Sequence, residues 1–205
     1  MENSSKIKWK GSTLLAPVPP VMVTCGDMEN SNIITIAWTG IVNTHPPMTY
    51  ISVRPSRHSY ELIKESGEFA INLVPKELVK KADFCGIYTG KKVNKFEKCG
   101  FGKQEATEVA CPLIKESPMS LECKVKEIIP LGTHDMFLAE IVAVDVEPEL
   151  LDEKGKLRLD RARLTAFAHG EYFEIGKKID DFGCSVKAKK SKGKKDAPKG
   201  KKASK

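Results

Sequence analysis

The sequence contains no apolar run that approaches the roughly 20 residues needed to cross a bilayer, and its amino terminus has no hydrophobic stretch typical of a signal peptide. It also has no Cys-x-x-Cys pair, although six cysteines are scattered through the chain. In a body of this size, such spacing favours reduced thiols over a disulfide framework or a zinc site. We therefore expect a cytoplasmic protein with no membrane partner and no metal site.

Several catalytic signatures are missing as well. The chain has no Gly-x-Gly-x-x-Gly loop, no Walker A loop, no His-Glu-x-x-His helix and no Gly-x-Ser-x-Gly elbow. An enzyme that lacks a recognisable nucleophile, metal site or dinucleotide loop is expected to obtain its chemistry from a bound cofactor. These absences direct the search for function toward a cofactor site.

The positive charge is concentrated at one end of the chain. The formal net charge is +7, yet residues 187–205 hold ten lysines and one acid, so this stretch alone carries +9 and residues 1–186 carry −2. The main body therefore gives no electrostatic argument for specific nucleic-acid binding. Length and composition favour one domain over residues 1–186, followed by a disordered Lys-rich tail over residues 187–205.

Alternation of apolar and polar residues predicts a mainly β fold with short α-helices. Residues 33–40 alternate with a period of two, which indicates a strand with two different faces. Residues 164–173 fit either a strand or a short helix. Many strands without regular strand–helix alternation favour a β-barrel or a sandwich. The other expected strands are 18–25, 48–53, 68–74, 120–129 and 135–147, and the expected helices are 56–65 and 76–88.

The strongest candidate site is the sequence Arg-Pro-Ser-Arg-His-Ser at residues 54–59. Pro55 ends the preceding strand, and Ser56 is well placed as the N-cap of the helix that follows. Unpaired N–H groups and the helix dipole favour an anion at such a position. Arg54 and Arg57 can add forked, charge-assisted hydrogen bonds to phosphate oxygens. The alternative, from spacing alone, is a solvated basic turn that only caps a helix.

The strand that precedes this turn suits a flat ligand. Ala37 and Gly40 are small enough for a planar ring to approach the main chain. Thr35 and Thr39 are expected to offer hydroxyl groups on the same face. The alternative is an ordinary strand with Trp38 in the core.

Two histidines have polar neighbours in the sequence. His134 is followed by an aspartate, and His169 is followed by Gly-Glu-Tyr. General acid or base catalysis is one role for such a histidine, and a position in a hairpin turn is the alternative. Spacing alone does not decide between these roles.

Taken together, these segments resemble the flavin reductase-like family on the FMN-binding split β-barrel, and most closely its flavoredoxin branch. The resemblance runs in the family's order over residues 12–186, and the ordered set is more specific than any one motif. The matching stretches are 32–40, 43–47, 52–59, 67–73, 90–96, 121–125, 132–140 and 169–172.

The resemblance implies a Greek-key split barrel that works as a homodimer, with FMN bound near the subunit interface. Phosphate contacts are implied for Arg54, Ser56, Arg57 and Ser59, with Lys91 beside them. The flavin ring and ribityl chain are implied to run along Thr35, Ala37, Trp38, Thr39 and Gly40, with Asn43 nearby. His134, in a Gly-Thr-His turn, would lie near the nicotinamide and is the one catalytic candidate.

We therefore predict an FMN-binding flavoprotein, and an oxidoreductase that transfers electrons or hydride through FMN. An NAD(P)H-dependent flavin or ferric reductase, with flavin as its substrate, is the first alternative. A pure electron carrier that docks to a redox partner protein is the second. A polyanion-binding module that acts through the lysine tail is the third.

Overall fold

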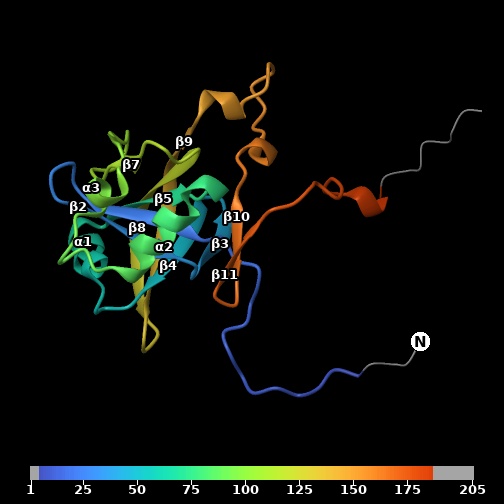
Figure 1. Ribbon diagram of the computed structural model, residues 1–205, viewed down its shortest axis with the longest axis horizontal. Helices are drawn as coiled ribbons and strands as arrows, with labels where there is room; N and C mark the ends of the chain where they lie inside the picture. Colours follow the sequence, from blue (N-terminus) through green and yellow to red (C-terminus); the bar gives the residue numbers. More distant parts are fainter. Residues whose placement is uncertain (1–4, 187–205) are drawn as a thin grey trace, which may run out of the picture.

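Seven strands form one antiparallel sheet in the computed structural model, which describes residues 5–186 (Figure 1). Their hydrogen-bonded order is β2-β1-β5-β8-β9-β4-β3. The strands are β1 (Val21–Gly26), β2 (Ser31–Ile36), β3 (Thr39–Thr44), β4 (Pro47–Val53), β5 (Glu68–Leu73), β8 (Met119–Pro130) and β9 (Asp135–Val146).

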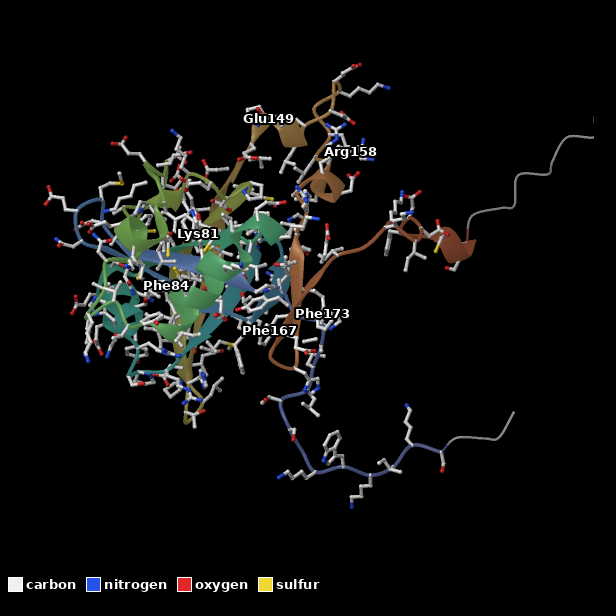
Figure 2. All side chains as sticks on the ribbon, viewed as in Figure 1. Lys81, Phe84, Glu149, Arg158, Phe167 and Phe173 are labelled. Carbon is white, nitrogen blue, oxygen red and sulfur yellow. The ribbon has the colours of Figure 1, made fainter. Side chains whose placement is uncertain are left out.

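Short hairpins and helices surround this sheet. Strand β6 (Lys103–Gln104) pairs with β7 (Leu113–Ile114), and β10 (Thr165–Ala168) pairs with β11 (Glu171–Glu174). Figure 2 labels Phe167 and Phe173 on the second hairpin, which joins the main body through main-chain bonds between Val18 and Phe167. The α-helices are α1 (His58–Ser66), α2 (Val79–Ile87) and α3 (Lys95–Cys99), and 3-10 turns occupy Lys76–Leu78, Pro148–Leu150, Leu159–Arg161 and Cys184–Val186.

The sheet curls because its two edge strands are consecutive in the chain. Strands β2 and β3 lie at opposite ends of the hydrogen-bonded order, yet only Ala37 and Trp38 separate them. The Trp38 carbonyl accepts a hydrogen bond from the Ser52 N–H of β4 at 2.9 Å. Two residues can join the edges only if the edges approach one another, as they do in a barrel. The predicted mainly β barrel with short helices is confirmed.

Strands β1 and β2 are buried on both faces. Val23 and Ile34 pack inside the curled sheet with Phe69, whereas Met22 and Ile33 pack on its outer side in a cluster with residues of α2 and α3. A strand covered on both sides is expected to be apolar at successive positions, as β1 is. The helices therefore fix the outer face of the strand that leads to residues 37–38.

One buried carboxylate ties a loop to the sheet. Glu122 of β8 is fully buried, and its oxygens accept hydrogen bonds from the N–H groups of Thr107, Glu108 and Val109 at 2.6–3.0 Å and from the Thr107 hydroxyl at 2.9 Å. Asp145 of β9 lies diagonally across the strand pair, since Ser120 pairs with Asp145 and Glu122 with the residue two positions earlier.

Two local predictions around the candidate site are wrong. The strand expected over residues 33–40 is interrupted, because β2 ends at Ile36 and β3 begins at Thr39. The helix expected from Ser56 begins at His58 with Arg57 as its N-cap, and no side chain caps it. Ser56 instead lies in a turn that the Arg57 N–H closes onto the Arg54 carbonyl at 3.0 Å. Gly67 ends the helix in the left-handed conformation at φ 68°.

The structure also tests the expectations for residues 164–173 and for membrane-spanning helices. Residues 164–173 are neither a single strand nor a helix, because β10 and β11 form a hairpin with His169 in its turn at φ 53°. Helix α3 lies in a stretch for which no helix or strand was expected. Within residues 5–186, no helix is long and apolar enough to cross a membrane. The predicted tail over 187–205 lies outside the described residues.

Candidate functional site

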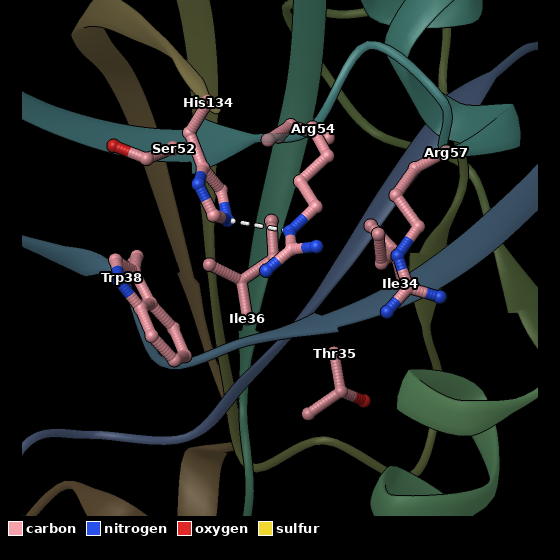
Figure 3. Close-up of a pocket in the computed structure, with 9 residues that line it drawn as sticks. Ile34, Thr35, Ile36, Trp38, Ser52, Arg54, Arg57 and His134 are labelled. Atoms are coloured by element: carbon pink, nitrogen blue, oxygen red, sulfur yellow. Dashed lines mark hydrogen bonds between the residues drawn. The ribbon is translucent and has the colours of Figure 1, made fainter. Parts of the chain in front are cut away.

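A pocket opens where β2 and β4 end and α1 begins. Its volume is about 300 Å³. Figure 3 shows the two guanidinium groups and a histidine ring directed into one space beside β2. The lining residues are Ile34, Thr35, Ile36, Trp38, Ser52, Val53, Arg54, Arg57 and His134, and we call this space the arginine pocket.

Arg54 and His134 meet inside this pocket. The Arg54 Nε–H donates to His134 Nε2 at 3.4 Å, and His134 Nδ1 lies 3.0 Å from the Thr133 hydroxyl (Figure 3). Burial, followed by the charges of Arg54 and Arg57, holds the pKa of His134 below its usual range. Because Nε2 accepts from a cation, His134 is a neutral imidazole with its proton on Nδ1.

Trp38 forms the flat wall of the pocket. Its ring lies 6.0 Å from the His134 ring with an angle of 10° between their planes, and its side chain is 48% exposed. A half-exposed indole parallel to an imidazole presents an aromatic surface toward solvent. The interruption of the strand at residues 37–38 is what turns Trp38 outward.

The two arginines have unused hydrogen-bonding capacity. Within the described residues, neither Arg54 nor Arg57 forms an ion pair with a carboxylate. Arg57 is the N-cap of α1, and its carbonyl accepts from the Tyr60 N–H at 3.0 Å, whereas the N–H groups of His58 and Ser59 have no acceptor inside the helix. Two unpaired guanidinium groups beside a helix start suit a dianionic phosphate.

Further positive groups lie next to Arg57. A small space of about 10 Å³ is lined by Arg57, His58 and Lys95 among others. Burial, followed by Lys91 and Lys95, holds the pKa of His58 below its usual range. Burial likewise lowers the pKa of Lys95, whose Nζ donates to main-chain carbonyls at 2.6 and 2.7 Å. The electrostatic potential on this side of the arginine pocket is therefore positive.

Gly90 lets the chain pass close to this cluster. A Cβ atom there would lie 2.3 Å from Asn32 Oδ1 and 2.7 Å from His58 Cδ2. Asn32 is itself fixed, since its Nδ2 donates to the buried Ser59 hydroxyl at 2.8 Å. Only glycine fits this approach, and it brings residues 89–91 beside the start of α1.

A larger, mostly apolar pocket lies next to Trp38. Its volume is about 580 Å³. Trp38 belongs to the lining of both pockets, so the indole separates them. The lining residues are Thr13, Leu14, Leu15, Val18, Ala37, Trp38, Thr39, Tyr50, Phe167, His169 and Gly170, and we call this space the apolar pocket.

The structure distributes the predicted site residues over several positions. Thr35, Trp38, Arg54, Arg57 and His134 line the arginine pocket, and Ala37 and Thr39 line the apolar pocket with Trp38. The remaining predicted residues, which line neither of these two pockets, are Gly40 against the Tyr50 ring, Asn43 near the β3–β4 turn, Ser56 in the turn before α1, Ser59 buried in α1 and Lys91 on the surface.

The expectation that Thr35 and Thr39 offer hydroxyls on one common face is wrong. The Thr35 hydroxyl donates to the Ala82 carbonyl of α2, and the Thr39 hydroxyl donates to the Tyr50 carbonyl at 2.6 Å. Both protons are used within the protein because the turn at residues 37–38 breaks the strand between the two threonines. These side chains position the backbone around the pockets, and only their oxygen lone pairs remain for a ligand.

Sequence reasoning missed Asn32, His58 and Lys95 beside the pocket. A signal for Lys95 was present, since Asn94 is an N-cap that accepts from the Glu97 N–H at 3.3 Å. Asn followed three residues later by Glu is a helix-start pattern. The burial of a lysine at the first position of that helix had no local signal.

Comparison with known proteins gives a matching domain family and several similar structures. The model of the flavin reductase-like domain matches residues 14–176. The flavoredoxin of Desulfovibrio vulgaris (Miyazaki F) superposes with a TM-score of 0.83 at 30% identity, over 89% of this chain and 100% of that one. A flavoredoxin from Methanosarcina acetivorans gives a TM-score of 0.82 at 28% identity, over 89% and 97% of the two chains.

Curated relatives extend the comparison. An uncharacterized protein of Aeropyrum pernix is 33% identical over 64% of this chain, and the match spans 50% of that relative. The FMN reductase (NADH) RutF of Pseudomonas syringae is 25% identical over 50% of this chain and 56% of its own length. A ferric-chelate reductase (NAD(P)H) of Archaeoglobus fulgidus is 24% identical over 51% of this chain and 62% of its own length.

Proposed function

The chain belongs to the flavin reductase-like family, and from that premise we propose that it binds FMN and transfers electrons or hydride through it, as an oxidoreductase of flavoredoxin type. Bound FMN would supply the chemistry, since its ring accepts and releases one or two electrons. The protein would supply binding, orientation and control of water and protons. The observation that carries the proposal is the pair of unpaired arginines beside the stacked Trp38 and His134 rings.

The donor set of the arginine pocket fits the phosphate of FMN. Arg54 and Arg57 would contact the phosphate oxygens, with Ser56 and the first N–H groups of α1 beside them and with Lys91 and Ser59 next to this group. Forked contacts from two guanidinium groups fix both the charge and the orientation of a phosphate. No carboxylate among the described residues competes for these two arginines.

The surroundings of Trp38 fit a ring and a sugar chain. Thr35, Ala37, Trp38, Thr39 and Gly40 follow the path from the arginine pocket to the apolar pocket, with Asn43 farther along β3. His134 holds its proton on Nδ1 and receives the Arg54 N–H at Nε2. An anion that takes up Arg54 would release Nε2, so His134 would be free to accept a proton at the site.

The test is a titration of the purified full chain with FMN, followed by flavin absorbance and fluorescence. Arg57→Ala should weaken FMN binding by roughly 30-fold, because one charged hydrogen-bonding group contributes about 2 kcal/mol. Arg158→Ala is the matched control, since Arg158 is paired with Asp160 on a remote surface turn. If wild-type protein shows no flavin binding, or if both variants bind FMN equally, the proposal fails.

A second candidate is an NAD(P)H-dependent flavin or ferric reductase. The names of the Pseudomonas and Archaeoglobus relatives favour it, and the apolar pocket beside Trp38 offers room for a second planar ligand. Anaerobic mixing of FMN-loaded protein with NADH or NADPH separates the two candidates. Rapid bleaching of the flavin band supports the reductase, whereas no bleaching with either nucleotide supports a carrier that receives electrons from a redox partner protein.

We also propose that two copies of the chain associate. The edge strand β3 exposes Ile41 and Val42, which are 82% and 51% exposed, close to Trp38. Apolar side chains on an open sheet edge favour pairing with another molecule. Light scattering after gel filtration tests this, and Ile41→Lys should shift a dimer toward monomer.

All six cysteines are free thiols in the structure, which fits the cytoplasmic location we propose.

A further inference from the structure

Two cysteines on different helices lie close together near the buried Lys95. The sulfur atoms of Cys85 on α2 and Cys99 on α3 lie 3.9 Å apart. In the part of the chain that the structure describes, no other pair of cysteine sulfurs lies within hydrogen-bonding distance. The segment between them, residues 86–98, contains Gly90 and the residues that pass beside the start of α1.

The two thiols differ in accessibility. Cys85 is fully buried, whereas Cys99 is half-buried at the last position of α3, next to the left-handed Gly100. Burial, followed by the neighbouring Cys99, raises the pKa of the Cys85 thiol to about 12, so this thiol keeps its proton. An oxidant from solvent therefore reaches Cys99 first.

A buried lysine, Lys95, lies on the same helix as Cys99. Lys95 and Cys99 are four residues apart in α3, which places them on the same face of the helix. The Lys95 ammonium donates to the Cys85 carbonyl at 2.7 Å and to the Ile33 carbonyl at 2.6 Å. Lys95 therefore holds α3 against α2 and β2 on the side of the helix where the two sulfur atoms meet.

We propose that Cys85 and Cys99 are a reversible thiol–disulfide pair that is oxidised by hydroperoxides. Cys99 loses its thiol proton, its sulfur attacks the peroxide oxygen and the O–O bond breaks. Cys99 becomes a sulfenic acid, and the expelled alkoxide or hydroxide takes up the proton that Cys99 released and leaves as an alcohol or water. The Cys85 sulfur then attacks the Cys99 sulfur, and the expelled hydroxide leaves with the Cys85 proton as water. In total, two thiols lose two electrons and the peroxide gains them.

Closing this bond requires a modest movement. The sulfur atoms must approach by roughly 2 Å from their present contact. Helix α3 spans five residues, Lys95–Cys99, and it can shift as a unit about Gly100. The resulting cross-link would tie α2 to α3 and fix residues 88–94, which run beside Arg57 and His58. This proposal does not depend on FMN binding.

The first test uses the full chain with Cys184→Ser, which removes the exposed lone cysteine. Hydrogen peroxide should remove two titratable thiols per molecule and two hydrogen atoms of mass, and dithiothreitol should restore both. A digest without reductant should contain the Cys85 peptide joined to the Cys99 peptide, while the buried Cys111 in the same digest stays unmodified. If Cys99 proceeds to sulfinic acid without a cross-link, or if Cys111 reacts as fast as Cys99, the proposal is overturned.

Variants at the two positions separate the steps. Cys99→Ser should abolish the loss of thiols under the same peroxide treatment. Cys85→Ala should leave a sulfenic acid on Cys99 that dimedone traps, and absence of the adduct in folded protein would contradict the sequence of steps. Because Cys85 is in the core, circular dichroism accompanies this variant, and the digest of the Cys184→Ser protein decides the question by itself if Cys85→Ala does not fold.

Discussion

Two clusters of charged side chains in this protein are built in opposite ways. Glu122 is buried and its carboxylate accepts four hydrogen bonds from the loop around Thr107. Arg54 and Arg57 line an open pocket and have no carboxylate partner within residues 5–186. The first cluster has used its hydrogen-bonding capacity to hold the fold, and the second has capacity left for a ligand. Unused hydrogen-bonding capacity, more than charge, is what makes the arginine pocket the candidate binding site.

A second comparison concerns the pKa values of two neighbouring carboxyl groups, Glu122 and Asp145. Burial raises the pKa of Glu122, but hydrogen bonds from Thr107 and Glu108 outweigh it, so the pKa lies below its usual range. Burial, followed by the hydrogen bond and charge of Glu122, raises the pKa of Asp145 to about 6. No N–H or hydroxyl group among the described residues donates to the buried Asp145 Oδ2, so only a proton shared with Glu122 could link the two carboxyl groups. One carboxylate stays charged and its neighbour takes up the proton.

The largest expected effect comes from removing the Glu122 carboxylate, which accepts four hydrogen bonds. Glu122→Ala leaves three N–H groups and a hydroxyl without their acceptor, and it should lower the free energy of unfolding by about 3 kcal/mol. Urea unfolding followed by circular dichroism measures this. Glu127→Ala, at an exposed position of the same strand, should stay within about 0.5 kcal/mol of wild type. Equal stability of the two variants would show that the Glu122 contacts do not hold the loop.

The second largest effect is expected on FMN affinity, when residue 57 of the arginine pocket keeps its positive charge but loses the forked shape of arginine. Arg57→Lys preserves the positive charge but removes the planar fork, so FMN affinity should fall by roughly tenfold, less than in Arg57→Ala. Isothermal titration with FMN measures the ratio. A lysine variant that binds like wild type would mean that the pocket attracts the phosphate by charge alone, without forked contacts.

A smaller effect should appear as a change of stability with pH. The pKa of Asp145 is raised on folding, so its protonated form stabilises the fold below about pH 4, and this contribution is lost as the pH rises through about 6. Asp145→Asn imitates the protonated form. The variant should therefore gain about 1 kcal/mol over wild type between pH 4 and pH 7, after allowance for the partial exposure of Asp145. Urea unfolding at both pH values measures the difference, and a pH-independent difference would contradict the raised pKa.

The smallest effect should come from Ser56. Because Arg57 is the N-cap and no side chain caps α1, Ser56→Ala should change the free energy of unfolding by less than about 0.5 kcal/mol. Asn94→Ala removes a real cap at α3 and should lower it by about 1 kcal/mol. Thermal unfolding of both variants gives the comparison. A loss of FMN affinity in Ser56→Ala without a loss of stability would assign this hydroxyl to the ligand.

Local patterns in the sequence predicted the parts of the site that local physics determines. The strand β4 and the short helix α1 that follows it are predicted by alternation and by helix-start signals, with the start of the helix displaced by two residues. The break at residues 37–38 was missed, because Thr, Ala and Trp continue a strand pattern and the closure of the barrel is what interrupts it. The sequence indicated Arg54 and Arg57 as phosphate ligands, but only the tertiary contacts show that neither pairs with a carboxylate within the described residues.

The burial of charged residues could not be predicted from the sequence. Glu122 lies between an apolar residue and a cysteine on a strand with several lysines, and nothing nearby indicates that a loop 13–15 residues earlier will supply its N–H donors. Lys95 is similarly placed by contacts to the distant Ile33 and to Cys85. These hydrogen bonds join residues that are far apart in the sequence. A single sequence therefore does not predict which charged side chains they bury.

The position of Trp38 has a practical consequence. The protein has two tryptophans, and the other, Trp9, is 76% exposed near the amino terminus, away from both pockets. A Trp9→Phe protein would therefore carry one indole, set between the arginine pocket and the apolar pocket and stacked on His134. The intrinsic fluorescence of Trp38 would therefore report ligand binding in either pocket in real time, without an added label.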